Sequence, residues 1–216
     1  MKQKIIAKLH EFDANGHPRY QVFRDWVEMS AIAIANAVTL PTKLREDREK
    51  QYLAIAGRYT KKEMYRFSDL LKMLGDALEE KMEDVLGDVY MKAGISSDRH
   101  GQFFTPYHLS QLMARMNPNF LASMQPCVEL VEPSCGAGGS IIAAGEYLAE
   151  NGIDYQRRIN VTCQDLDWTC VYMCYTQLAL LGFQGCVVQG DTLSEPYRPG
   201  VTKANYVFWL PKTFLP

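Results

Sequence analysis

The spacing of apolar residues divides the chain into a helical first part and an alternating second part. Up to about residue 95, apolar positions recur with the helical period, which predicts helices over 20–38, 43–59, 60–81 and 83–93 after a short amphipathic start at 1–18. Thr60-Lys-Lys-Glu63 has the form of a capping box. From residue 128 onward, short β-branched runs alternate with helical stretches, which is the pattern of an α/β domain.

The alternating part begins with the apolar run 128–131, a glycine-rich turn and the helical run 141–149. The apolar run is expected to be a buried strand that ends before Pro133. The glycines at 136, 138 and 139 let bare backbone N–H groups approach a nucleotide-like ligand, although a tight strand-to-helix turn has the same composition. Ile141 replaces the third glycine of the dinucleotide fingerprint, and no Gly-Lys-Ser/Thr follows, so NAD, FAD and a P-loop are disfavoured.

Acidic residues follow the next two predicted strands. The strand 159–164 ends at Asp165, a position from which a carboxylate can accept hydrogen bonds from the ribose of an adenosine. Asp167 is expected to cap the helix 168–181. Asp191 follows the strand 186–189, and a fourth strand is predicted over 205–209. Trp168 fits either stacking near an adenine or an interior position.

A second candidate segment is Gly101-Gln-Phe-Phe-Thr-Pro106. Thr105 is a natural N-cap and Pro106 a natural first helical residue, which predicts a helix to about residue 116. The free N–H groups at such a helix start suit a carboxylate. The ring of Phe104 fits either a ligand contact or the core.

These segments resemble the S-adenosylmethionine (SAM) motifs of N6-adenine DNA methyltransferases, the group of the type I restriction-modification modification subunits. The resemblance is carried by Glu132-Pro-Ser-Cys-Gly-Ala-Gly-Gly139 and by the hexapeptide ending at Pro106, in the family's order, and it covers roughly residues 85 to 210. It implies a partial Rossmann-like methyltransferase domain with parallel strands, SAM as cofactor, DNA as partner, and a partner subunit or homo-oligomer. The SAM ligands that it implies are Phe104, Thr105, Pro106, Glu132, Pro133, Ser134, Cys135, Gly136, Gly138, Gly139, Asp165 and Asp191.

Within that set the resemblance implies particular roles. Asp165 would bind the ribose, and Asp191 the adenine amino group of SAM. Glu132 would accept hydrogen bonds either from the N–H groups of its own loop or from the ligand amino group.

The family pattern breaks after the fourth strand. The family holds the target amino group with Asn-Pro-Pro-Tyr/Phe, whereas this chain has Leu210, Pro211, Lys212 and Thr213. Leucine has no acceptor, so no catalytic residue is assigned. The predicted sheet is also shorter than the family's, which fits either a short form that keeps the SAM half or a chain whose remainder lies elsewhere. Because the Asn is replaced rather than cut off, the short form is favoured. Two functions stay open: methyl transfer to adenine N6 in DNA if a catalytic motif is completed, or an inactive SAM-binding or DNA-associated accessory protein.

Composition bounds the remaining possibilities. With 216 residues, 47% of them apolar, we expect a helical region over 1–95 and a SAM-binding domain over 96–216. With a formal net charge of −2, the chain has no overall positive charge that would indicate a nucleic-acid partner. The basic residues between 45 and 66 alternate with acidic ones, which favours a solvated face over a phosphate-contacting patch. The six cysteines form no C-x-x-C pair and are expected to be reduced, buried and without metal, in a cytoplasmic protein with no membrane span.

Overall fold

The computed structural model describes residues 1–13, 16–94, 104–116 and 127–211. Of the segments singled out in the sequence, residues 101–103, Lys212 and Thr213 lie outside these ranges. In the described part, no helix is both long and apolar enough to cross a bilayer.

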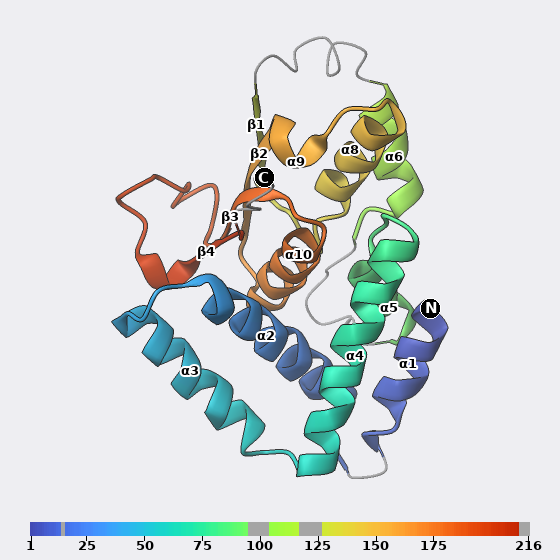
Figure 1. Ribbon diagram of the computed structural model, residues 1–216, viewed down its shortest axis with the longest axis vertical. Helices are drawn as coiled ribbons and strands as arrows, with labels where there is room; N and C mark the ends of the chain where they lie inside the picture. The colour runs from blue at the N-terminus through green and yellow to red at the C-terminus, as the bar shows by residue number, and fades with distance from the viewer. Residues whose placement is uncertain (14–15, 95–103, 117–126, 212–216) are drawn as a thin grey trace.

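Among the described residues up to 94, five helices form the first part of the molecule, as the apolar spacing predicts (Figure 1). They are α1 (Lys2–His10), α2 (Arg19–Val38), α3 (Lys43–Ala56), α4 (Lys61–Glu80) and α5 (Val85–Lys92). The predicted capping box is present, because Thr60 accepts from the Glu63 N–H while the Glu63 carboxylate accepts from the Thr60 N–H at 2.8 Å. The five helices pack through apolar faces into one core that continues into the α/β part.

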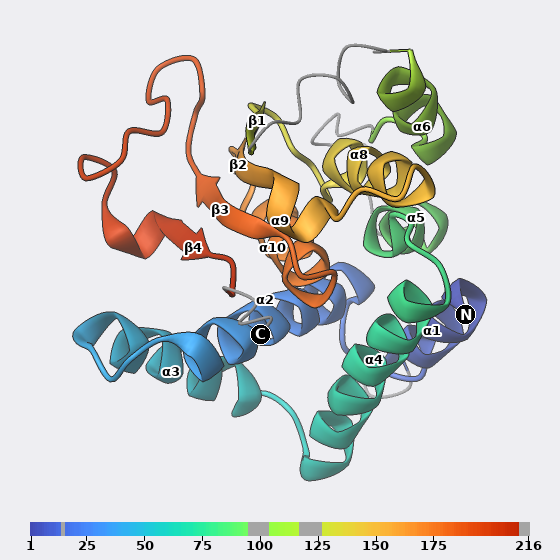
Figure 2. The same cartoon turned by 45° about the horizontal axis from the view of Figure 1, so that its top comes forward.

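Within residues 127–211, the α/β part contains a four-stranded sheet in the order β1-β2-β3-β4. Its elements are α6 (Tyr107–Arg115), β1 (Val128–Glu132), α8 (Gly139–Glu150), α9 (Tyr155–Arg158), β2 (Ile159–Asp165), α10 (Trp168–Leu180), β3 (Gln184–Gln189), a 3₁₀ turn (Ala204–Tyr206) and β4 (Val207–Trp209). A helical region followed by an α/β domain confirms the predicted fold class. Figures 1 and 2 show α10 between the sheet and α2, and α10 packs against both α2 and β3.

The expectation that all strands are parallel is wrong for β4. The strands β1, β2 and β3 are parallel, but β4 pairs antiparallel with β3, with Val188 opposite Val207 and Cys186 opposite Trp209. The connection 190–206 contains only the short 3₁₀ turn and no crossover helix. Parallel neighbours are usually joined through a crossover helix, and this connection without one brings the chain back antiparallel along the edge of β3.

Two burial predictions are also corrected. Val131 is 65% exposed, because β1 is an edge strand and Val131 lies on the face opposite to Val128 and Leu130, which pack against the core. Cys127 is exposed at the start of β1, whereas the other five cysteines are buried, and all six are free thiols.

Arg48 ties the helical region to the sheet. The Arg48 side chain on α3 is buried; it donates a hydrogen bond to the Val207 carbonyl at 2.9 Å, and its guanidinium lies 4.2 Å from the centre of the Phe208 ring. A buried guanidinium with these two partners links segments 159 residues apart. The edge strand β4 is therefore held from the helical side as well as by β3.

Replacing Arg48 with methionine is expected to lower the free energy of unfolding by about 1–3 kcal/mol, because the Val207 carbonyl loses its charged donor and Phe208 its cation. Urea unfolding followed by circular dichroism measures the change. Lys50→Met is the matched control on the same helix, since Lys50 is exposed and pairs only with Asp47 among the described residues. Equal stability of the two variants would contradict the role of Arg48.

Candidate functional site

The carboxyl ends of β1 and β2 border a cavity of about 330 Å³. The register aligns Glu132 with Cys163, two residues before Asp165, so the glycine loop that follows β1 lies beside the end of β2. The residues that line this cavity, called here the loop cavity, are Asp84, Phe104, Thr105, Ser110, Ser134, Cys135, Gly136, Ala137, Gly139, Ser140, Asp165 and Cys170. Segments from the helical part, α6 and the sheet thus meet at one site.

The glycine loop is shaped by two residues with positive φ. Gly136 has φ 52°, and Gly138 has φ 93° and caps α8 without a side chain. A Cβ on Gly138 would come within 3.2 Å of the Cys174 sulfur, so the position suits glycine both in conformation and in space. The loop is attached to β2, because the Cys135 N–H donates to the Gln164 carbonyl at 3.0 Å.

Asp165 organises the loop from the end of β2. Its carboxylate accepts from the Gly136 N–H at 2.8 Å and from the Asp167 N–H at 3.0 Å. Burial raises the pKa of Asp165 above its ordinary value, and these hydrogen bonds oppose that shift. Asp167 caps α10 as predicted, accepting from the Thr169 N–H.

Glu132 turns back onto its own loop. Its carboxylate accepts from the Ser134 N–H at 3.3 Å, which is the first of the two roles expected for it. Burial raises the pKa of this half-buried carboxyl. Glu132 does not line the loop cavity, and neither do Pro106, Pro133 and Gly138.

The expected cap of α6 is wrong by one residue. Pro106, not Thr105, is the N-cap, and α6 begins at Tyr107. Pro106 has an extended backbone with ψ 133°, so it precedes the first turn, and its carbonyl accepts from the Leu109 N–H. Thr105 nevertheless lines the loop cavity, and the Phe104 ring lies over Gly136, where a Cβ would be 3.2 Å from the ring.

A second cavity, of about 650 Å³, lies beyond the ends of β2 and β3. Leu166, Gln189, Asp191 and Tyr206 are among the residues that line it, and Asp165 and Leu166 are consecutive residues on the walls of the two cavities. Asp191 therefore borders this cavity and not the one that holds most of the predicted site. Its carboxylate accepts from the Leu193 N–H and the Ser194 hydroxyl, which lowers its pKa.

Trp168 is partly buried. Its ring stacks on Tyr172 and Tyr206 and packs against the core. Of these rings, Tyr206 borders the second cavity.

Five lining residues were absent from the predicted set: Asp84, Ser110, Ala137, Ser140 and Cys170. Asp84 could have been found from its capping spacing, because its carboxylate accepts from the N–H of Gly87 three residues later. No local signal marks Ser110, which reaches the cavity only through the packing of α6 on α8.

The segment aligned with the family's catalytic motif lies at the other end of the sheet. Leu210 is 5% exposed and belongs to the main core, and its N–H donates to the Gly185 carbonyl at 3.0 Å. Gly185 is near the amino end of β3, whereas the loop cavity lies at the carboxyl ends of β1 and β2 and the second cavity at those of β2 and β3. Leu210 lies at the amino end of β3 because β4 runs antiparallel to β3.

Most of the clustered basic residues have internal partners. Arg58 pairs with Asp25, Arg66 with Glu11 and Lys50 with Asp47, while Arg48 is buried against β4. These pairings favour a structural role for this part of the surface.

The buried cysteines form no metal centre in the described chain, where no group of three or more His, Cys, Asp or Glu side chains is arranged to hold an ion. Burial raises the pKa of Cys170 and Cys174 well above that of an ordinary thiol, which keeps them protonated.

A glycine loop and an acidic strand end around a cavity at the carboxyl ends of parallel strands are the arrangement found in α/β domains of the nucleotide-cofactor class. A family model described as "N-6 DNA Methylase" matches residues 81–212, and the chain belongs to this family. The resemblance inferred from the motifs is thereby confirmed.

Comparison with solved structures gives a more distant likeness. A protein of Listeria monocytogenes provisionally assigned as a class I S-adenosylmethionine-dependent methyltransferase is similar with a TM-score of 0.47 and 12% identity. The likeness covers 89% of this chain and 54% of the other, so the chain spans about half the length of that protein. No curated protein matches the sequence.

Proposed function

We propose that this chain is a SAM-binding member of the N-6 DNA methylase family that does not transfer a methyl group by itself. The observation that carries the proposal is the loop cavity, where Phe104, the glycine loop and Asp165 meet. Both cavities fall in the size range of small-molecule sites, about 300–1,000 Å³, and the consecutive residues Asp165 and Leu166 line one cavity each.

The donor set fits SAM. Asp165 can accept from the ribose hydroxyls, and Asp191 is available to the adenine amino group in the second cavity. The start of α8 presents N–H groups with no side-chain cap, and Ser110 has a buried hydroxyl without a partner among the described residues. When bound, SAM supplies an activated methyl group, and the chain's own residues hold and orient it.

In the described residues, the position aligned with the family's catalytic asparagine carries no hydrogen-bond acceptor on its side chain. Methyl transfer to an adenine amino group requires acceptors that orient that amino group at the methyl donor. The aligned Leu210 has no such group and belongs to the core at the opposite end of the sheet. The role that follows is that of a SAM-binding accessory protein whose partner is DNA or a DNA-modifying subunit.

A second candidate function is methyl transfer to adenine N6 in DNA after another chain supplies the acceptor-binding segment. Two observations favour this second function: both cavities lie at the carboxyl ends of strands, and the chain belongs to the N-6 DNA methylase family.

Isothermal titration calorimetry is expected to show SAM binding to the purified chain with one site per molecule. With tritiated SAM and adenine-containing duplex DNA, the chain alone is expected to leave the DNA label at background, while a functional DNA adenine methyltransferase serves as positive control. Labelled N6-methyladenine from the chain alone would overturn the accessory role, and absence of SAM binding would overturn the proposal as a whole.

A further inference from the structure

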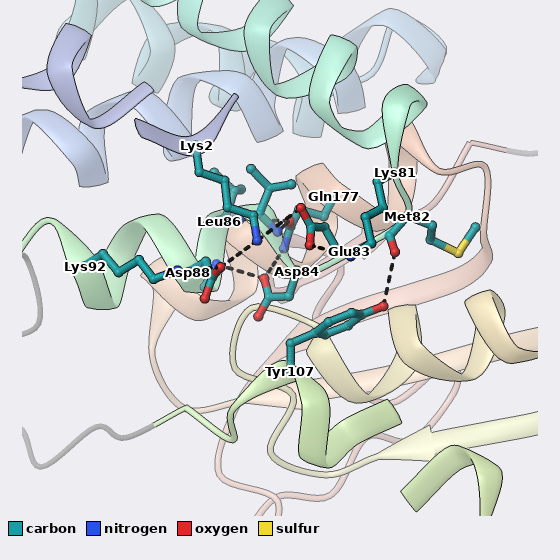
Figure 3. Close-up of polar contacts among 12 residues, drawn as sticks. Lys2, Lys81, Met82, Glu83, Asp84, Leu86, Asp88, Lys92, Tyr107 and Gln177 are labelled. Atoms are coloured by element: carbon teal, nitrogen blue, oxygen red, sulfur yellow. Dashed lines mark hydrogen bonds and ion pairs between the residues drawn. The ribbon is translucent and has the colours of Figure 1, made fainter. Parts of the chain in front are cut away.

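Asp84 is a buried carboxylate that reaches the loop cavity from outside the sheet. It precedes α5 and is 6% exposed. Its Oδ1 accepts from the Gly87 N–H at 2.8 Å and from the Gln177 side-chain amide at 2.9 Å. Figure 3 shows Asp84 between the start of α5 and Gln177 of α10.

The same network fixes Asp84 to the glycine loop. The Gln177 amide also donates to the Ala137 carbonyl at 2.8 Å, and its oxygen accepts from the N–H groups of Val85 and Leu86. Gly87 leaves room for the carboxylate, because a Cβ there would collide with it. The orientation of Asp84 is therefore fixed by Gly87 on α5, by Gln177 on α10 and, through Gln177, by the glycine loop.

The other oxygen of Asp84 faces the cavity. Oδ2 would be 3.1 Å from a Cβ on Gly139, a cavity-lining residue at the start of α8. Within the described residues, no N–H or O–H group donates a hydrogen bond to Oδ2. A desolvated carboxylate oxygen with spare acceptor capacity favours a cationic donor.

Ser110 on α6 is an independent indication that a polar ligand belongs there. Its hydroxyl is buried, with the residue 2% exposed, and has no hydrogen-bond partner in the described chain. Ser110 lines the same cavity as Asp84. Buried polar groups are nearly always paired, so this hydroxyl has capacity for a ligand atom.

At this end of the cavity, a group that favours an anion lies close to Asp84, which favours a cation. The start of α8, where Gly139 and Ser140 line the wall, favours an anion because of its free N–H groups and the helix dipole. Asp84 favours a cation within a few ångströms of it. A zwitterionic α-amino acid group carries both charges on one carbon, whereas a phosphate or a simple carboxylate would be repelled by Asp84.

We propose that Asp84 receives the α-ammonium group of the methionyl part of SAM, while the start of α8 receives its carboxylate. This assignment rests on the proposed SAM binding and adds a residue from the helical side of the molecule to that site. Ser110 contributes a further hydrogen bond to the same amino acid group. Asp84 thus recognises the amino acid end of the ligand and has no direct part in binding the nucleoside.

The test compares SAM with 5′-methylthioadenosine, which keeps the nucleoside and lacks the amino acid group. Asp84→Asn keeps an oxygen for Gly87 and Gln177 but removes the charge. Calorimetry is expected to show SAM affinity reduced by about 10- to 100-fold, as for loss of a charged hydrogen bond, with 5′-methylthioadenosine affinity unchanged within twofold. Ser110→Ala, which breaks no hydrogen bond within the described residues, is expected to act in the same direction by a smaller factor.

Asp88→Asn is the matched control. It makes the same charge change on α5, where Asp88 pairs with Lys2 and Lys92 away from the cavity lining, and it should leave both affinities unchanged. Wild-type SAM affinity in Asp84→Asn, or equal loss for both ligands, would overturn the assignment while leaving SAM binding intact. Failure of the wild-type chain to bind either ligand would instead overturn the proposed function. If Asp84→Asn unfolds at a lower temperature than the wild type, Ser110→Ala with the same two ligands decides the question.

Discussion

Replacing Asp165 with alanine is expected to weaken SAM binding by about 1.5–4 kcal/mol, or roughly 10- to 1,000-fold. Two effects combine. The variant loses the acceptor proposed for the ribose hydroxyls, and it loses the hydrogen bonds from the Gly136 and Asp167 N–H groups that hold the glycine loop to β2. Since those two N–H groups would need new partners, the loop itself should become less ordered.

Calorimetry with SAM measures this effect, and Asp154→Ala provides the matched control. Asp154 caps α9 by accepting from the Gln156 N–H, lies outside both cavities, and should leave the affinity unchanged. Asp165→Asn should fall between wild type and Asp165→Ala, because an amide retains one acceptor oxygen. Unaltered SAM affinity in Asp165→Ala would remove this residue from the site.

Replacing Gly185 with alanine is expected to lower the free energy of unfolding by about 3 kcal/mol or more. Gly185 lies in β3 with φ 123°, a conformation that other residues rarely adopt, and a Cβ there would overlap the backbone of Val161 in β2. Relief would require the two strands to separate at the point where they pair. Because Gly185 also accepts from the Leu210 N–H, the attachment of the segment after β4 should weaken as well.

Gly152→Ala separates the two contributions in the same urea unfolding experiment. Gly152 also has a positive φ, of 72°, but a Cβ there would have nothing within 4 Å. This control should therefore cost only about 1–2 kcal/mol for the backbone conformation. If Gly185→Ala were no more destabilising than Gly152→Ala, the close approach of β2 and β3 would be refuted.

The sequence determined the parts of the site that depend on neighbours along the chain. The glycine turn at 136–139, the acidic end of β2 and the capping roles of Thr60 and Asp167 all follow from residue type and short spacing. Leu210 in place of an asparagine is likewise visible without a structure. Periodicity, turn composition and caps act within a few residues, so they can be recognised locally.

Only the tertiary structure decided which distant groups share a cavity. The antiparallel course of β4 took Leu210 to the far end of the sheet, and the packing of α5 and α6 brought Asp84 and Ser110 to the glycine loop. Asp191 was directed to a separate cavity by the same three-dimensional arrangement. Such placements depend on contacts between residues tens of positions apart in the chain. The free energies of these contacts come from burial and pairing in the folded core, so no periodic pattern in the sequence indicates them.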